Sequence, residues 1–246
     1  MMTSMKKKVL AVSLVISIIA ILSMGTLAWF QDDDLVTNDF MIADSDDTPD
    51  DVFSVDVYEE HDVDGDGVIE DDEKRLDGIT YDEQEVTPGA VLPKKAFVEN
   101  TGKFDQYVRV KATISDIGVW LDVLGIDPAN IGTAAAPALS NFFVVGSGFD
   151  NLWHRNDAET VYDEQASTLT FVYYFKGVLK ADADPVPFLE AVKIPTELTR
   201  EDVVGMDGEF SIKLLAEAVQ SVNMGDFYTD DHVANAIQSF DIAFGQ

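Results

Sequence analysis

The stretch YVRVKATI, residues 107–114, alternates strictly between two kinds of side chain. Its even-numbered positions carry Val, Val, Ala and Ile, whereas its odd-numbered positions carry Tyr, Arg, Lys and Thr. Successive side chains of a strand point to opposite faces, so this period of two predicts a β-strand with one face in a core. The same period recurs at residues 169–175 and 210–218, and shorter strand signals lie at 53–58, 96–98, 142–145 and 191–194.

Two stretches have the three- and four-residue spacing of helices instead. One runs from Asp116 to Leu124, and the other follows Thr229, a predicted N-cap with Asp230 and Asp231 in the first turn. Many short strands and only two helices indicate a mainly β protein. The predicted fold is a β-sandwich of the jelly-roll or immunoglobulin-like kind, with short helices and an inserted calcium loop described below.

The N-terminus has the three parts of a secretory signal. Three lysines at 6–8 precede an uncharged apolar run at 9–25, and Thr26-Leu27-Ala28 offers small residues for cleavage between Ala28 and Trp29. An uncleaved membrane anchor is the alternative, because the run approaches the roughly 20 residues that span a bilayer. We therefore expect a secreted protein of the extracellular matrix or cell surface, attached to a membrane only through an uncleaved signal.

The expected organisation has a single folded domain. Residues 1–28 form the signal peptide, and residues 29–50 form an acidic N-terminal segment of the mature chain. Residues 51–246 form the β-sandwich domain, with the calcium loop inserted at 60–75.

The net charge and the absence of cysteine exclude several classes of function. The chain carries 16 basic and 46 acidic residues, a formal net charge of −30, and cleavage of the signal would remove only positive charge. Such a chain repels the phosphate backbone, so we expect no nucleic-acid partner. The absence of cysteine excludes disulfides, zinc–thiolate sites, iron–sulfur ligation and thiol nucleophiles. An exported protein of this kind must be stabilised by its core, by metal or by assembly.

Residues 62–73, DVDGDGVIEDDE, match the calcium-loop pattern D-x-D-x-D-G-x-I-x-x-x-E at every constrained position. Calcium favours six to eight oxygen ligands, and closely spaced carboxylates repel one another unless a cation lies between them. The preceding segment reads as a strand, so we expect one Ca²⁺ loop inserted in a β domain and not a paired EF-hand. The alternative is a solvated acidic loop. The predicted ligands are Asp62, Asp64, Asp66, the Val68 carbonyl, Glu70 and Glu73.

Nothing in the sequence predicts a catalytic site. The motifs H-E-x-x-H and G-x-S-x-G are absent, and the three histidines, His61, His154 and His232, have no zinc-ligand spacing. We therefore expect no enzymatic activity.

Several short segments follow one another in a definite order. GTLAWF at 25–30 precedes DD at 32–33 and TNDF at 37–40; TPG at 87–89, Lys94, FVENTG at 97–102 and YVRV at 107–110 come next; VL at 178–179, IP at 194–195 and AEAVQ at 216–220 come last. In this order they resemble the TasA/camelysin family over most of the chain. The calcium loop is not part of that pattern.

The resemblance implies a jelly-roll-like sandwich that is processed by a SipW-type signal peptidase and polymerises head to tail into biofilm matrix fibres. In that scheme the mature N-terminal segment is a donor strand that completes the sheet of the next subunit. The local sequence is compatible with this role through Leu35, Val36, Phe40, Met41 and Ile42. A simple acidic tail is the alternative for this segment.

Two other classes of function remain open from the sequence. One is a monomeric calcium-binding surface or adhesion module, and the other is a metallopeptidase, an assignment that the camelysin branch carries. The charge adds a further expectation for the fibre. Strongly acidic subunits repel one another, so assembly should need calcium or high salt.

Overall fold

The computed structural model describes residues 31–37, 54–60, 70–76, 87–131, 133, 139–146, 148–199, 211–221 and 229–245, and residues 31–37 as backbone only. Within these ranges no helix is both long and apolar enough to cross a membrane.

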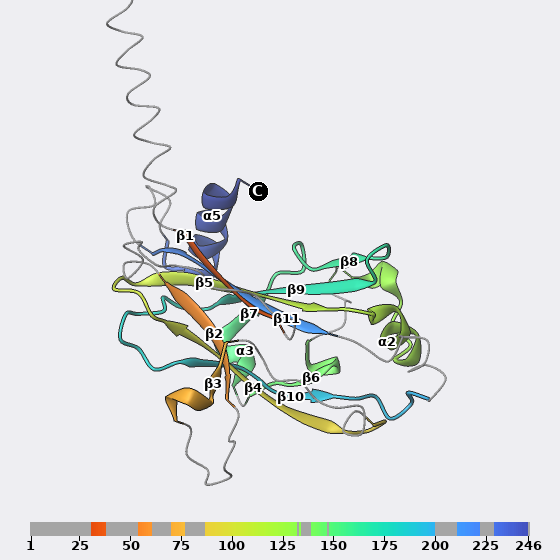
Figure 1. Ribbon diagram of the computed structural model, residues 1–246. Coiled ribbons are helices and arrows are strands. Elements are labelled where there is room, and N and C mark those ends of the chain that lie inside the picture. The colour runs from red at the N-terminus through yellow and green to blue at the C-terminus, as the bar shows by residue number, and fades with distance from the viewer. Residues whose placement is uncertain are drawn as a thin grey trace, which may run out of the picture.

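Two antiparallel sheets pack face to face (Figure 1). Sheet A has six strands: β1 (Gln31–Thr37), β11 (Ile212–Gln220), β5 (Gln106–Ile114), β9 (Thr168–Phe175) and β7 (Trp153–Arg155) in that order, with β8 (Val161–Asp163) also on β9. Sheet B has five: β3 (Lys74–Arg75), β2 (Val55–Glu60), β4 (Val91–Asn100), β10 (Val186–Lys193) and β6 (Phe143–Val144). The predicted mainly β sandwich is therefore confirmed.

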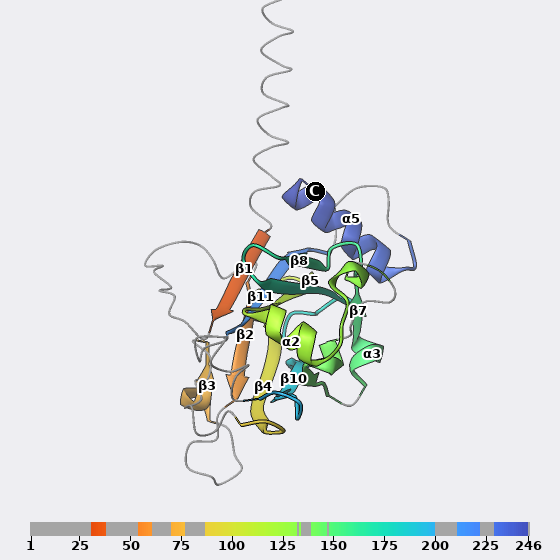
Figure 2. The same cartoon turned by 90° about the vertical axis from the view of Figure 1, so that its right-hand side faces the viewer.

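Short helices cover the ends and one face of the sandwich. They are α2 (Ile117–Val123), α3 (Phe149–Leu152), α5 (His232–Phe244) and the 3-10 turns η1 (Asp71–Glu73), η2 (Pro128–Asn130) and η3 (Leu139–Asn141). Helix α5 lies on the outer face of sheet A, above β5 and β11 (Figures 1 and 2). There Ala236 and Phe240 pack against Tyr107, Tyr174 and Val219.

The core lies between the sheets, where the alternating strands turn their apolar faces inward. The even-numbered residues of β5, from Val108 to Ile114, are at most 1 % exposed, as the period of two predicts. Phe149, Trp153, Tyr173 and Phe188 form an aromatic group in this core, with ring centroids 5.0–6.5 Å apart.

Several local predictions need correction. The short strand predicted at 191–194 is the end of the eight-residue β10. The strand predicted at 96–98 is part of the ten-residue β4, whose inward-facing positions include Lys94, and this charge interrupts the apolar pattern. The N-cap of α5 is Asp231 and not Thr229, because the Asp231 carboxylate accepts hydrogen bonds from the Val233 and Ala234 amides. Thr229 instead donates its amide to the side chain of Asn235.

Asn100 ties the β4–β5 turn to a distant segment. Its amide nitrogen donates to the carbonyls of Phe104 (2.8 Å) and Leu179 (2.9 Å), and its oxygen accepts from Gly102 N (3.0 Å) and Gln106 Nε2 (2.6 Å). The side chain is only 5 % exposed, so its four hydrogen-bonding groups are satisfied inside the protein. The segment FVENTG thus has a structural role in this fold.

We expect Asn100→Ala to lower the free energy of unfolding by about 1–3 kcal/mol, because buried donors and acceptors lose their partner. Chemical denaturation of the parent and variant proteins measures the change. Asn151→Ala, at an exposed position of α3, is the matched control and should shift stability by no more than about 0.5 kcal/mol. Equal effects of the two substitutions would contradict this role.

Candidate functional site

Strand β1 is the outermost strand of sheet A (Figure 2). It pairs antiparallel with β11 in a seven-residue ladder that runs from Gln31 opposite Val219 to Thr37 opposite Lys213. The predicted donor residues Leu35 and Val36 lie in this ladder, opposite Leu215 and Leu214. Phe40, Met41 and Ile42, together with the predicted cleavage site at Ala28 and Trp29, lie outside the described residues.

Strand β11 offers β1 a complete backbone edge. Its other edge pairs with β5 from Ile212 to Gln220, so only the β1 side is available to another strand. Removing β1 would expose a row of unpaired N–H and C=O groups, which is a ready template for another strand. The N-terminal part of the predicted mature chain therefore occupies an edge that a second strand could equally occupy.

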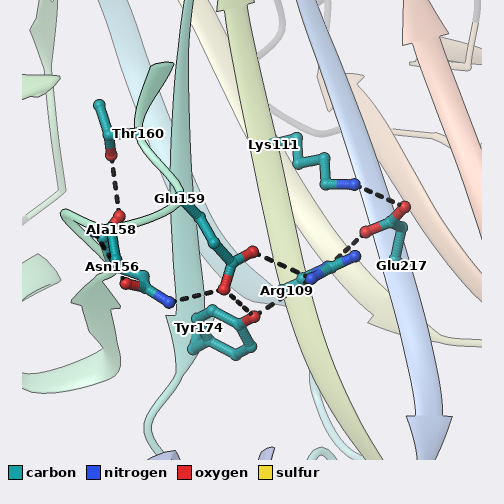
Figure 3. Close-up of polar contacts among 8 residues, drawn as sticks. All are labelled: Arg109, Lys111, Asn156, Ala158, Glu159, Thr160, Tyr174 and Glu217. Atoms are coloured by element: carbon teal, nitrogen blue, oxygen red, sulfur yellow. Dashed lines mark hydrogen bonds and ion pairs between the residues drawn. The ribbon is translucent and has the colours of Figure 1, made fainter. Parts of the chain in front are cut away.

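A polar cluster lies on the face of sheet A that carries α5 (Figure 3). We call Arg109, Lys111, Glu159, Tyr174 and Glu217 the Arg109 cluster. Arg109 is fully buried, and its Nε is ion-paired with Glu217. Its Nη1 lies 3.0 Å from Glu159 Oε2 and 3.2 Å from the Tyr174 hydroxyl, while Lys111 Nζ lies 2.9 Å from the other oxygen of Glu217.

Helix α5 closes the cluster from above. The Phe240 and Phe244 ring centroids lie 4.4 and 5.1 Å from the guanidinium carbon of Arg109, within cation–π range. Burial, followed by the hydrogen bond to Glu159 (2.6 Å), raises the pKa of the Tyr174 hydroxyl well above its usual value. For Arg109, burial opposes the charge, but hydrogen bonds to Tyr174 and Glu217 outweigh it and the pKa is raised. The guanidinium is therefore a permanent buried charge.

The acidic loop joins two strands of sheet B. Strand β2 leads into it, η1 forms its last turn, and β3 follows it, with Glu59 opposite Arg75 and Glu60 opposite Lys74. The segment before the loop is thus a strand, as predicted. Four of the predicted calcium ligands, Asp62, Asp64, Asp66 and Val68, lie outside the described residues.

The remaining two predicted ligands, Glu70 and Glu73, lie close together at the end of the loop. The Glu70 amide donates to Glu73 Oε2 (3.2 Å), and the Glu73 amide donates to the Glu70 carbonyl (3.0 Å). Glu73 is 6 % exposed. A hydrogen bond with the Glu73 carboxyl, then slight desolvation and the Glu73 charge, raises the pKa of the exposed Glu70. Two adjacent carboxyls of this kind fit a hard cation, which would remove their repulsion.

The described residues, Glu70 and Glu73 included, do not form a complete metal site. In the parts of the chain that the structure describes, no group of three or more His, Cys, Asp or Glu side chains could hold a metal ion. His154 lies exposed on β7 and His232 lies exposed at the start of α5, whereas His61 is outside the described residues.

A buried ion pair, which the sequence did not reveal, lies at the loop end of sheet B. Lys94 of β4 and Glu59 of β2 are both fully buried and ion-paired on the inner face. Burial lowers the pKa of Lys94, although the Glu59 charge opposes this shift. Because Glu59 is the second-last residue of β2, the pair anchors the strand that enters the acidic loop to β4.

Tyr58 gives the loop end of sheet B a measurable pH dependence. It is 4 % exposed, and its ring stacks on Phe97 and under the Lys74 ammonium. Burial, followed by the charges of Glu99 and Glu60, raises its pKa to about 12. The unfolded chain releases this proton near pH 10, so the stabilising contribution is complete below pH 10 and is lost as pH rises towards 12.

We expect the free energy of unfolding to fall above pH 10, with Tyr58 contributing up to about 1.4 kcal/mol per pH unit. Tyr58→Phe should flatten this slope, because it removes the titrating hydroxyl and keeps the stacked ring. Denaturant unfolding at pH 8, 10 and 11 measures both chains. Parallel curves for Tyr58→Phe and the parent would show that Tyr58 does not carry the effect.

Comparison of the chain with protein-family models, with curated proteins and with solved structures finds no match.

Proposed function

We propose that the protein is a secreted structural subunit that assembles head to tail into extracellular, biofilm-matrix fibres by donor-strand exchange, with bound calcium stabilising the subunit. The observation that carries this proposal is the β1–β11 ladder, in which an N-terminal strand completes the edge of sheet A. The resemblance of the ordered sequence segments to the TasA/camelysin family supports the same function.

The chain has the length that exchange requires. Residues 38–54 separate β1 from β2, and a fully extended segment of this length spans at most about 60 Å. A β1 that leaves its own β11 could therefore reach the β11 edge of a neighbouring copy. Each exchange is heterologous, because one subunit gives a strand and receives another, so repetition generates a filament unless a ring closes.

Electrostatics would make this assembly depend on ions. The net charge is −30, and several of the few basic side chains, namely Lys94, Arg109, Lys111 and Arg155, are already ion-paired within the described part of the subunit. The remaining basic side chains are far outnumbered by the 46 acidic residues, so two subunits repel each other. Salt shortens the range of the repulsion, and a divalent cation can bridge carboxylates, so assembly should need calcium or high salt.

Because the chain has no cysteine, a single introduced pair reports which chain supplies β1. We expect Leu35→Cys with Leu215→Cys to form a disulfide, since opposite residues of an antiparallel pair have Cα atoms about 4.5–5.5 Å apart. In fibres the bond should join different chains and give a covalent ladder on denaturing gels. Samples assembled with calcium or high salt, checked by negative-stain electron microscopy, provide the fibres.

The matched control is Gln31→Cys with Lys213→Cys, whose positions lie six residues out of register, about 20 Å apart. This pair should stay reduced under the same oxidation. Fibres that contain only intramolecular bonds would contradict strand exchange. Single particles in every salt and calcium condition would favour the monomeric calcium-binding surface module instead.

For the calcium loop, we expect millimolar calcium to raise the Tm of the mature chain, because a ligand that binds only the folded state stabilises it. Glu73→Gln should abolish the rise, since the last loop position is the bidentate ligand in this pattern. Glu164→Gln removes the same charge from an exposed position in the β8–β9 turn of the opposite sheet and should keep the rise. Calorimetric scans with calcium and with chelator decide between these outcomes; an undiminished rise in Glu73→Gln would place the calcium elsewhere.

A further inference from the structure

The β1–β11 ladder contains an electrostatic conflict. Strand β1 reads QDDDLVT, and its register places Asp33 directly opposite Glu217 of β11. Like charges at directly opposite positions destabilise an antiparallel pair. Asp33 is therefore a poor partner for Glu217 if Glu217 keeps its full negative charge, whereas Asp32 and Asp34 lie opposite Ala218 and Ala216.

The next strand of sheet A supplies the compensation. Arg109 lies opposite Glu217 on β5 and is ion-paired with one carboxylate oxygen, while Lys111 Nζ binds the other at 2.9 Å. Both oxygens of Glu217 are thus engaged by cations on the side away from β1 (Figure 3). Glu217 itself is only 5 % exposed, so water screens its charge weakly.

The charges of the cluster balance only when Lys111 is included. Arg109 is shared between Glu217 and Glu159, so its single positive charge faces two carboxylates. Lys111 adds the second positive charge and brings the cluster to neutrality. Without Lys111 the cluster would carry one net negative charge, directly opposite Asp33.

Lys111 is also the member of the cluster whose substitution disturbs the fold least. The Arg109 guanidinium is held by Tyr174 and Glu159 and is covered by Phe240, whereas the Lys111 side chain is 25 % exposed. Substituting Lys111 therefore changes charge without opening the core. Substituting Arg109 would remove one of the two cationic partners of the buried Glu217 and the cationic partner of Glu159, and would threaten the fold.

We infer that Lys111 is a specificity-determining residue of the β11 edge, which makes this edge able to accept an acid-rich strand. The strand it accepts is QDDDLVT of β1. The inference that a second copy supplies this strand rests on the proposed function. The inference that the β11 edge accepts β1 of the same chain does not rest on it. Lys111 acts through Glu217 and is a positioning residue for the docked strand.

Hydrogen exchange of the mature chain, followed by mass spectrometry, tests the inference. We expect Lys111→Gln to speed exchange of the 31–37 amides about two- to fivefold at low salt, because an unfavourable opposite pair opens the ladder more often. Amides of the central β5–β9 ladder serve as an internal reference and should keep their rates. In 1 M salt the difference should disappear, because the Debye length falls to about 3 Å.

Three variants separate a specific role from general charge. Lys213→Gln removes one positive charge from β11 itself, opposite Thr37, and should leave exchange of β1 nearly unchanged. Asp33→Asn in the Lys111→Gln chain should restore the parent rate, and Lys111→Arg should retain it. Asp33→Asn alone should slow exchange below the parent rate, and this variant disturbs no buried group on β11.

The outcomes separate this inference from strand exchange between copies. Equal acceleration by Lys213→Gln and Lys111→Gln, or no rescue by Asp33→Asn, would overturn the role of Lys111. A cross-linking experiment that gives no covalent ladders would overturn strand exchange between copies. It would not affect the hydrogen-exchange result, because hydrogen exchange reports β1 docking whichever chain supplies the strand.

Discussion

Burial of the Arg109 guanidinium is the constraint around which sheet A and its covering elements are arranged. A permanently charged group that is removed from water must find carboxylates, hydroxyls or aromatic faces, since an unpaired buried charge is strongly destabilising. Arg109 finds Glu217 on β11, Tyr174 on β9, Glu159 in the turn before β8, and Phe240 on α5. One side chain therefore connects three strands, a turn and the last helix.

The Arg109 cluster extends to β11, the strand that pairs with the edge strand β1. Glu217 belongs to both the Arg109 cluster and the strand that receives β1, so packing of α5 and docking of β1 meet at one carboxylate. The arrangement places a balanced set of charges beneath an edge whose incoming strand is acidic. It offers a physical reason why two basic residues of a very acidic chain lie beside β11 and not on the exposed surface.

In sheet B the buried charges lie on the inner face, between the two sheets. Its buried pair, Lys94 with Glu59, lies inside the sandwich where β2 is about to enter the acidic loop. Beyond it, at the end of the acidic loop, the Glu70 amide donates to the Glu73 carboxylate and the Glu73 amide donates to the Glu70 carbonyl. Charge inside the sandwich is thus neutralised within the chain.

The sequence alone determined the class of fold, because alternation such as that of residues 107–114 depends only on which faces meet a core. It also located the calcium-loop pattern and the N-terminal segment with Leu35 and Val36. It misplaced the start of α5 and shortened β4, since Lys94 breaks an apolar pattern that only its pairing with Glu59 explains. Tertiary structure decided the Arg109 cluster, the register of Asp33 opposite Glu217 and the role of Asn100. In each case the partners are far apart in the chain, and strand pairing brings them together.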